Sequence, residues 1–122
     1  MKHGRFYLYE SKQCLWSHVA VATSFIDRLT GLTTRAGLPR QEALWLPACS
    51  AIQTWRMQFA IDLIGLDKAG HICRVRRNIQ PGGWVHLAGV DSVLECEAGC
   101  HYPLEKWLHR RLQFVRTERG SW

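Results

Sequence analysis

Two acidic residues stand inside apolar runs of the sequence, where carboxylates are uncommon. Asp62 lies in the run from Phe59 to Leu66, and Glu95 lies in the run from Ser92 to Cys96. A buried carboxylate is costly unless it is paired or hydrogen-bonded. Two carboxylates whose environments separate their pKa values can also work as general acid and base. Asp62 and Glu95 are therefore the candidate catalytic residues.

The same two carboxylates also fit a structural role. An arginine guanidinium can hold a carboxylate through two parallel hydrogen bonds, and Arg28 and Arg35 are available in the segment before them. A network of Arg28, Arg35, Asp62 and Glu95 would lock a short helix to a sheet. Structural ion-pair networks shift the pKa values of carboxylates just as active sites do, so a shifted pKa does not distinguish the two roles. The residues favour the structural role and a protein that is not an enzyme, with a small hydrolase using Asp62 and Glu95 as the alternative.

A second group of residues predicts a binding surface. Tryptophan and arginine are enriched in the residues that carry most of the binding energy at interfaces, and loops commonly present them. We expect a protein or small-molecule ligand to contact a surface made of Gln53, Trp55, Arg56, Trp84 and His86. The leading hypothesis is therefore a binding or accessory module.

The chain is basic, with a formal net charge of +6, which could favour an anionic partner. Cationic grooves with stacking aromatic rings bind single-stranded nucleic acid. The sequence carries no helix-turn-helix and no RNA-binding strand signature, so nucleic-acid binding is a second alternative. Its candidate contacts are Arg74, Arg76, Arg77, Lys106, Arg110 and Arg111.

The cysteines predict free thiols. There are five of them, so at least one is unpaired, and their spacing forms no dense disulfide framework. Cys96, Cys100 and His101 are of zinc-binding type, but no second Cys-x-x-Cys pair completes the four ligands of a closed site. We expect no metal and no cofactor. The start of the chain lacks the apolar run of a secretory signal, and no window is long enough for a membrane span, so the expected location is the cytoplasm.

The elements that would position these residues are short. The length of 122 residues fits one domain, 1–122. Ser24 can cap a short helix from Phe25 to Thr30 after a first hairpin, and Pro103 can start a second helix that reaches Phe114. Alternating or apolar segments predict strands at 5–10, 14–23, 43–46, 59–66, 71–77 and 92–96, and 85–88 can form a short piece of its own. The predicted class is α+β, mainly β, with one short helix after the first hairpin and a C-terminal helix.

Several motifs, taken in order, resemble a known family. They include Pro47-Ala48-Cys49-Ser50-Ala51-Ile52-Gln53-Thr54-Trp55-Arg56-Met57, then Ala60-Ile61-Asp62, and then Val93-Leu94-Glu95-Cys96-Glu97-Ala98-Gly99. The combination resembles the DUF192 family, also called UPF0127, of small bacterial and archaeal proteins, over residues 21–99. The resemblance implies a compact, mainly β domain of barrel-like or sandwich-like shape, and it implies no established activity.

The sequence departs from the family pattern at two places. Gln53 stands where the family often has histidine, so any role of that imidazole is absent here. The family usually ends with a Gly-Asp turn and a last strand, and the residues from His101 to Phe114 differ from that pattern. We expect the divergent basic segment 100–122 to have a helix in place of the last strand.

Overall fold

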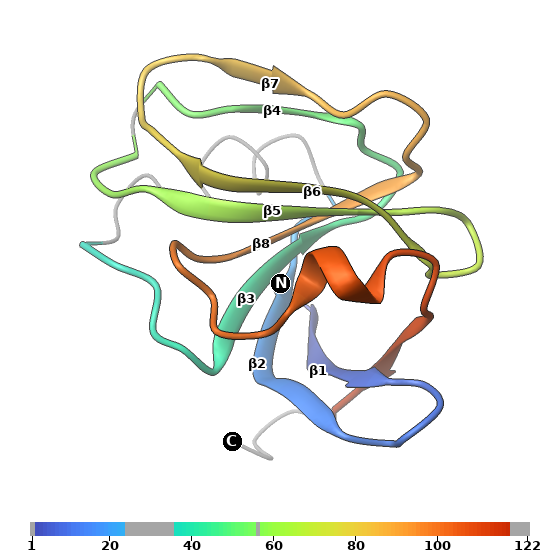
Figure 1. Ribbon diagram of the computed structural model, residues 1–122. Coiled ribbons are helices and arrows are strands. Elements are labelled where there is room, and N and C mark those ends of the chain that lie inside the picture. Colours follow the sequence, from blue (N-terminus) through green and yellow to red (C-terminus); the bar gives the residue numbers. More distant parts are fainter. Residues whose placement is uncertain (1, 24–35, 56, 118–122) are drawn as a thin grey trace.

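A computed structural model of the protein describes residues 2–23, 36–55 and 57–117 (Figure 1). The expected helix from Phe25 to Thr30 falls outside these ranges. The described elements are β1 Lys2–Leu8, β2 Cys14–Val21, β3 Glu42–Leu46, β4 Ala51–Gln53, β5 Ile61–Leu66, β6 Ile72–Ile79, β7 Trp84–His86, β8 Ser92–Glu97, the one-turn 3-10 helix η1 Leu104–Trp107, and β9 Leu112–Arg116.

Seven strands form one curled sheet in the order β6-β5-β8-β3-β2-β1-β9. Only the β2–β3 pair is parallel among the described strand pairs of this sheet. The two edge strands approach one another at one end, where His71 and Arg111 form an isolated bridge and the Ile72 N–H donates to the Arg110 carbonyl at 2.9 Å. The sheet is therefore a half-barrel, and β4 and β7 form a separate two-stranded ribbon beside it.

Alternation along the strands divides the apolar residues between the two faces of the sheet. The inner cluster lies within the curl and includes Trp16, Ile64 and Leu94. The outer cluster includes Leu44, Leu63 and Val93, and it packs beneath the ribbon through Ile52, Leu87 and other residues. Strands β5 and β8 are buried on both faces, which explains why they read as nearly continuous apolar runs.

The α+β assignment and the C-terminal helix were wrong, because the described chain is mainly β. The apolar residues from Leu104 onward make only the single turn η1, after which Leu108 is extended and His109 has a positive φ of 73°. The chain then enters β9, which pairs antiparallel with β1 and places Phe114 opposite Phe6. The segment thus keeps a last strand, contrary to our expectation.

Among the described residues, none of the helical turns has the length and apolar character needed to cross a membrane.

Candidate functional site

Asp62 on β5 is fully buried on the inner face of the sheet, and three donors satisfy its carboxylate. Arg77 Nη1 donates to Oδ2 at 2.8 Å, the Cys100 N–H donates to Oδ2 at 2.9 Å, and the Asn78 N–H donates to Oδ1 at 2.8 Å. Hydrogen bonds from backbone amides and a guanidinium offset the desolvation of a buried carboxylate. Asp62 therefore ties β6 and the turn after β8 to β5.

Arg77 is the centre of this network. Its Nε and Nη2 atoms donate to the two carboxylate oxygens of Glu105 at 2.8 and 2.9 Å, and its guanidinium also donates to the carbonyl oxygens of Cys100 and Tyr102. The hydrogen bonds from Arg77 lower the pKa of Glu105 to about 2. A guanidinium presents five donors in a fixed fork, and Arg77 uses them to hold η1 and the preceding turn against the rim of the sheet.

Glu95 on β8 is in a different environment. Only 5% of it is exposed, and it lies on the outer face between Leu44 of β3 and Leu63 of β5. No hydrogen bond from a described residue contributes to the pKa of its carboxyl group. Burial raises its pKa from 4.5 to about 8, so the group is mainly protonated at neutral pH.

The two candidate catalytic carboxylates therefore point to opposite faces of the sheet. Asp62 is paired with Cys96 in the β5–β8 register, and Glu95 is paired with Leu63. Because neighbouring residues on a strand alternate in direction, the adjacent strands do not bring these carboxyl groups together. Arg28 and Arg35 of the expected network lie outside the described residues, and the cation that Asp62 contacts is Arg77.

The predicted binding surface gathers on the ribbon. Trp84 lies opposite Gln53, and His86 lies opposite Ala51, so these side chains share the outer face of the ribbon, while Ile52 and Val85 face the sheet. Trp84 is 70% exposed and Trp55, two residues after Gln53, is 58% exposed. Gln53 Oε1 accepts a hydrogen bond from the Trp55 N–H at 3.1 Å. Arg56, the fifth member of the predicted set, lies outside the described residues.

Thr54 holds the loop that leads into Trp84. Its side chain is fully buried, its N–H donates to the Gly83 carbonyl at 2.7 Å, and the Gly83 N–H donates to its hydroxyl at 2.9 Å. The Gly82 N–H donates to the Thr54 carbonyl at 2.8 Å. The backbone around Trp84 is thus fixed from within, while the indole ring itself is left in solvent.

The basic residues considered for nucleic acid do not share one face. Arg77 is held by carboxylates, Arg110 contacts Glu10 at 3.3 Å, and the Arg111 guanidinium lies 4.5 Å from the centre of the Tyr9 ring. Arg74 and Arg76 are exposed on the outer side of β6, where they pair with Gly65 and Leu63, whereas Arg77 points inward. Lys106 is exposed on η1.

The cysteines are free thiols in the structure, three half-buried and two buried. Among the described residues, no group of three or more His, Cys, Asp or Glu side chains is placed to hold a metal ion. Cys96 and Cys100 lie next to one another beside Asp62, as described below.

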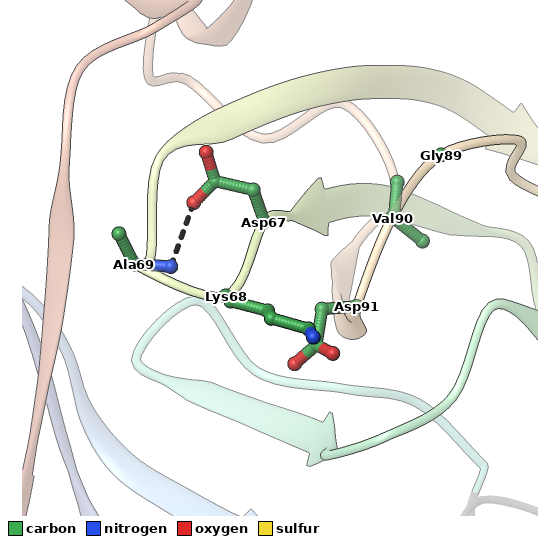
Figure 2. Close-up of a pocket in the computed structure, with 6 residues that line it drawn as sticks. All are labelled: Asp67, Lys68, Ala69, Gly89, Val90 and Asp91. Carbon is green, nitrogen blue, oxygen red and sulfur yellow. Dashed lines mark hydrogen bonds between the residues drawn. The ribbon is translucent and has the colours of Figure 1, made fainter.

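A cavity of about 410 Å³ opens between the β5–β6 turn and the segment before β8 (Figure 2). Its lining includes Asp67, Lys68 and Asp91, and the Lys68 side chain extends toward Asp91 in this view. Burial alone would raise the pKa of Asp67, but hydrogen bonds from His71 and Ala69 outweigh it and lower that pKa. Asp67 Oδ1 accepts from the Ala69 N–H at 3.0 Å and from the His71 N–H at 2.8 Å, so its carboxylate shapes the turn.

Residues 8–105 match the model of the family DUF192, described as uncharacterized ACR. The chain belongs to the DUF192 family. The resemblance seen in the sequence is therefore confirmed, and the match runs beyond residue 99 as far as η1. No curated protein matches this sequence significantly.

Two solved structures share the DUF192 fold of this chain. One is from Sinorhizobium meliloti 1021 and is described provisionally as a transcription regulator; it has 18% identity and a TM-score of 0.76, with 93% of this chain and 92% of that chain covered. The other, a protein of unknown function from Novosphingobium aromaticivorans DSM 12444, has 15% identity and a TM-score of 0.73, with 91% and 83% covered. At such identities the likeness concerns the fold.

Sequence reasoning missed Arg77 and Glu105 as members of the Asp62 network. The hairpin around the turn Asp67 to Gly70 indicates that β6 lies beside Asp62, but regular pairing centred on that turn would place Val75 opposite it. Register irregularities in the β5–β6 pair shift the facing residues to 77 and 78. Glu105 carried no such signal, since it reaches Arg77 only through the turn that follows β8.

Proposed function

We propose that this DUF192 protein is a non-catalytic binding module whose partner docks on the outer face of the β4–β7 ribbon. The observation that carries this proposal is the exposure of Trp84 and Trp55, at 70% and 58%. Large aromatic side chains in solvent contribute little to folding, and they are the residue types that anchor interfaces.

The shape of this surface favours a macromolecular partner. Small ligands are usually bound in concave sites that bury most of their surface. The described pocket is lined by the β5–β6 turn and the segment before β8 rather than by the ribbon, and Trp84, on a backbone that Thr54 fixes, is left 70% exposed. A preformed aromatic anchor loses little conformational entropy when it becomes buried against a partner.

A protein partner is favoured over nucleic acid. Three of the six basic residues considered for nucleic acid are engaged by carboxylates or by an aromatic ring of this chain. Arg74 and Arg76 lie on the ribbon side of the sheet, and they are the residues of this set that nucleic acid bound there would contact. Nucleic-acid binding would show itself by a steep dependence on salt.

The test compares two pairs of truncations on the purified full chain. The double variant Trp55→Ala/Trp84→Ala removes the ribbon anchors, and Leu108→Ala/Val115→Ala removes two exposed apolar side chains elsewhere. Each protein is used as bait in extract of its own organism, and each protein that is captured is then expressed alone and titrated against the three chains.

We expect a directly binding protein whose affinity falls at least tenfold with the tryptophan variant and is unchanged with the control variant. Thermal unfolding should be alike for the three chains, because the truncated side chains are exposed. Equal affinity for the tryptophan variant would overturn the proposal. Salt-sensitive binding of a single-stranded oligonucleotide, with no protein partner, would replace it by the nucleic-acid alternative.

A further inference from the structure

Two cysteines meet beneath the turn that follows β8, outside the ribbon surface. Cys96 is fully buried on the inner face of β8, directly opposite Asp62 in the register. The chain then reverses at Ala98 and Gly99, where Gly99 has a φ of +74°. The Cys100 N–H donates to Asp62 Oδ2 at 2.9 Å, and the Cys100 carbonyl accepts from Arg77 Nη1 at 2.8 Å. Both backbone groups of Cys100 are therefore anchored over the face that carries Cys96.

The two thiols differ in their readiness to ionise. The hydrogen bond from Cys96 lowers the pKa of Cys100 to about 7, and a hydrogen bond from the Tyr102 backbone and the charge of Arg77 act in the same direction. The same thiol–thiol hydrogen bond, together with burial, raises the pKa of Cys96. A thiolate is the nucleophile in thiol chemistry, so Cys100 is the reactive member and Cys96 keeps its proton.

The pair lies beneath an exposed turn. Cys100 is 7% exposed, while its neighbours Ala98, Gly99 and His101 are exposed. A reagent of the size of hydrogen peroxide can reach a sulfur at this depth more readily than a bulky disulfide can. The other three thiols lie elsewhere: Cys14 on β2, Cys49 before the ribbon, and Cys73 on β6.

We propose that Cys96 and Cys100 are a peroxide-reactive dithiol that closes to a reversible intramolecular disulfide. The Cys100 thiolate attacks one oxygen of hydrogen peroxide, the O–O bond breaks, and hydroxide leaves, which gives a sulfenic acid on Cys100. The Cys96 sulfur then attacks the Cys100 sulfur, the S–O bond breaks, and the Cys96 proton departs with the hydroxyl group as water. The peroxide is reduced by two electrons and the dithiol is oxidised by two. A small dithiol reverses the step by thiol–disulfide exchange.

The experiment uses the full chain and limiting hydrogen peroxide. After the reaction, free thiols are blocked under denaturing conditions and the chain is digested and analysed by mass spectrometry. We expect a peptide pair linked through Cys96 and Cys100, which dithiothreitol separates again. The matched control is Cys73→Ser, which removes a half-buried thiol on β6 and should leave the linked pair unchanged.

Two single variants assign the roles. With Cys96→Ala, the sulfenic acid on Cys100 has no resolving thiol and should be trapped by dimedone; with Cys100→Ala, Cys96 should remain a free thiol. In the unsubstituted chain, the rate of Cys100 alkylation should be half-maximal near pH 7. If either variant fails to fold, the linked peptides found in the digest of the unsubstituted chain still show whether Cys96 and Cys100 form the disulfide.

The proposal is overturned if Cys96 and Cys100 stay free at a peroxide dose that oxidises Cys73, or if the disulfides formed join other cysteines or separate molecules. It is independent of the ribbon, because Trp55→Ala/Trp84→Ala leaves this dithiol intact. Failure of one proposal therefore says nothing against the other.

Discussion

Asp62 and Glu95 are both buried carboxyl groups on adjacent central strands, yet they are in opposite chemical situations. Asp62 accepts hydrogen bonds from one guanidinium and two backbone amides. Glu95 lies between two leucines on the other face, with a pKa of about 8. Burial alone therefore does not determine the chemical state of a carboxyl group. The hydrogen-bond donors around the group determine it as well.

The difference follows from the alternation of the strands. Asp62 faces the rim of the inner side, where the turn after β8 and strand β6 supply donors. Glu95 faces the outer apolar cluster, which the ribbon covers. Asp62 is accommodated because a guanidinium and two amides donate to its carboxylate. Glu95, which no described donor reaches, avoids the cost of burying a charge by keeping its proton.

The largest effect is expected when the guanidinium of Arg77 is removed. Arg77→Met leaves Asp62 as a buried charge with only its two backbone donors, and the expected loss is about 3–5 kcal/mol in the free energy of unfolding. Urea denaturation of the purified chain measures it. The matched control is Arg76→Met, the exposed neighbour on the same strand, for which we expect a change within about 0.5 kcal/mol. Equal, small losses for both variants would show that the two amides suffice for Asp62.

The two strands that carry Asp62 and Glu95 could be predicted from the sequence, because each is a short apolar run. The interval 59–66 contains β5, and 92–96 covers nearly all of β8. The family was identified for the same reason, since its motifs are local. Both carboxyl groups were placed within apolar strands, but which face each one occupied depended on the register between strands.

The C-terminal region shows why the rest could not be predicted. Leu104, Trp107, Leu108 and Leu112 have helical spacing, yet Leu104 and Leu112 are buried while Leu108 is 41% exposed. The edge of β1 needs a pairing strand, and β9 supplies it, with Phe114 packing against Phe6 at a ring distance of 5.4 Å. This long-range pairing outweighs the local helical pattern. Glu105 reaches Arg77 because this segment forms the single turn η1 before it enters β9.

A second test concerns the pH dependence that Glu95 imposes. Between its unfolded pKa of 4.5 and its folded pKa of about 8, the folded chain holds a proton that the unfolded chain has lost, so stability falls as pH rises. From about pH 5 to about pH 7 this group should lower the free energy of unfolding by about 2–3 kcal/mol. Glu95→Gln should remove that slope, because the amide does not ionise.

Urea denaturation at several pH values measures the slope for both chains. Glu97→Gln is the matched control, since Glu97 lies on the same face of β8 but contacts Arg40 at 3.6 Å and is partly exposed. It should leave the slope of the unsubstituted chain in place. Parallel profiles for the unsubstituted chain and Glu95→Gln would mean that Glu95 gains a donor on ionisation, and the contrast with Asp62 would then disappear.

The smallest effect is expected at Glu105, the exposed partner of Arg77. Its side chain is 57% exposed, so solvent weakens the pair, and Glu105→Gln should cost about 0.5–1 kcal/mol. Because the pKa of Glu105 falls from 4.5 to about 2 on folding, the contribution is present above about pH 4.5 and is lost as pH falls toward 2. Unfolding at about pH 7 and about pH 3.5 measures this, and the difference between the two chains should shrink at the lower pH.

Glu10→Gln is the control for this last prediction, because Glu10 is a similarly exposed acid that contacts Arg110 at 3.3 Å. Its loss should be no larger than that at Glu105, whose two oxygens both accept from Arg77. If Glu105→Gln instead cost as much as Arg77→Met, then the exposed pair, rather than the buried one, would carry the stabilisation by Arg77. Asp62 would then be held mainly by its backbone donors. The difference between Asp62 and Glu95 would then come from the backbone amides that reach Asp62 and not from the charge of Arg77.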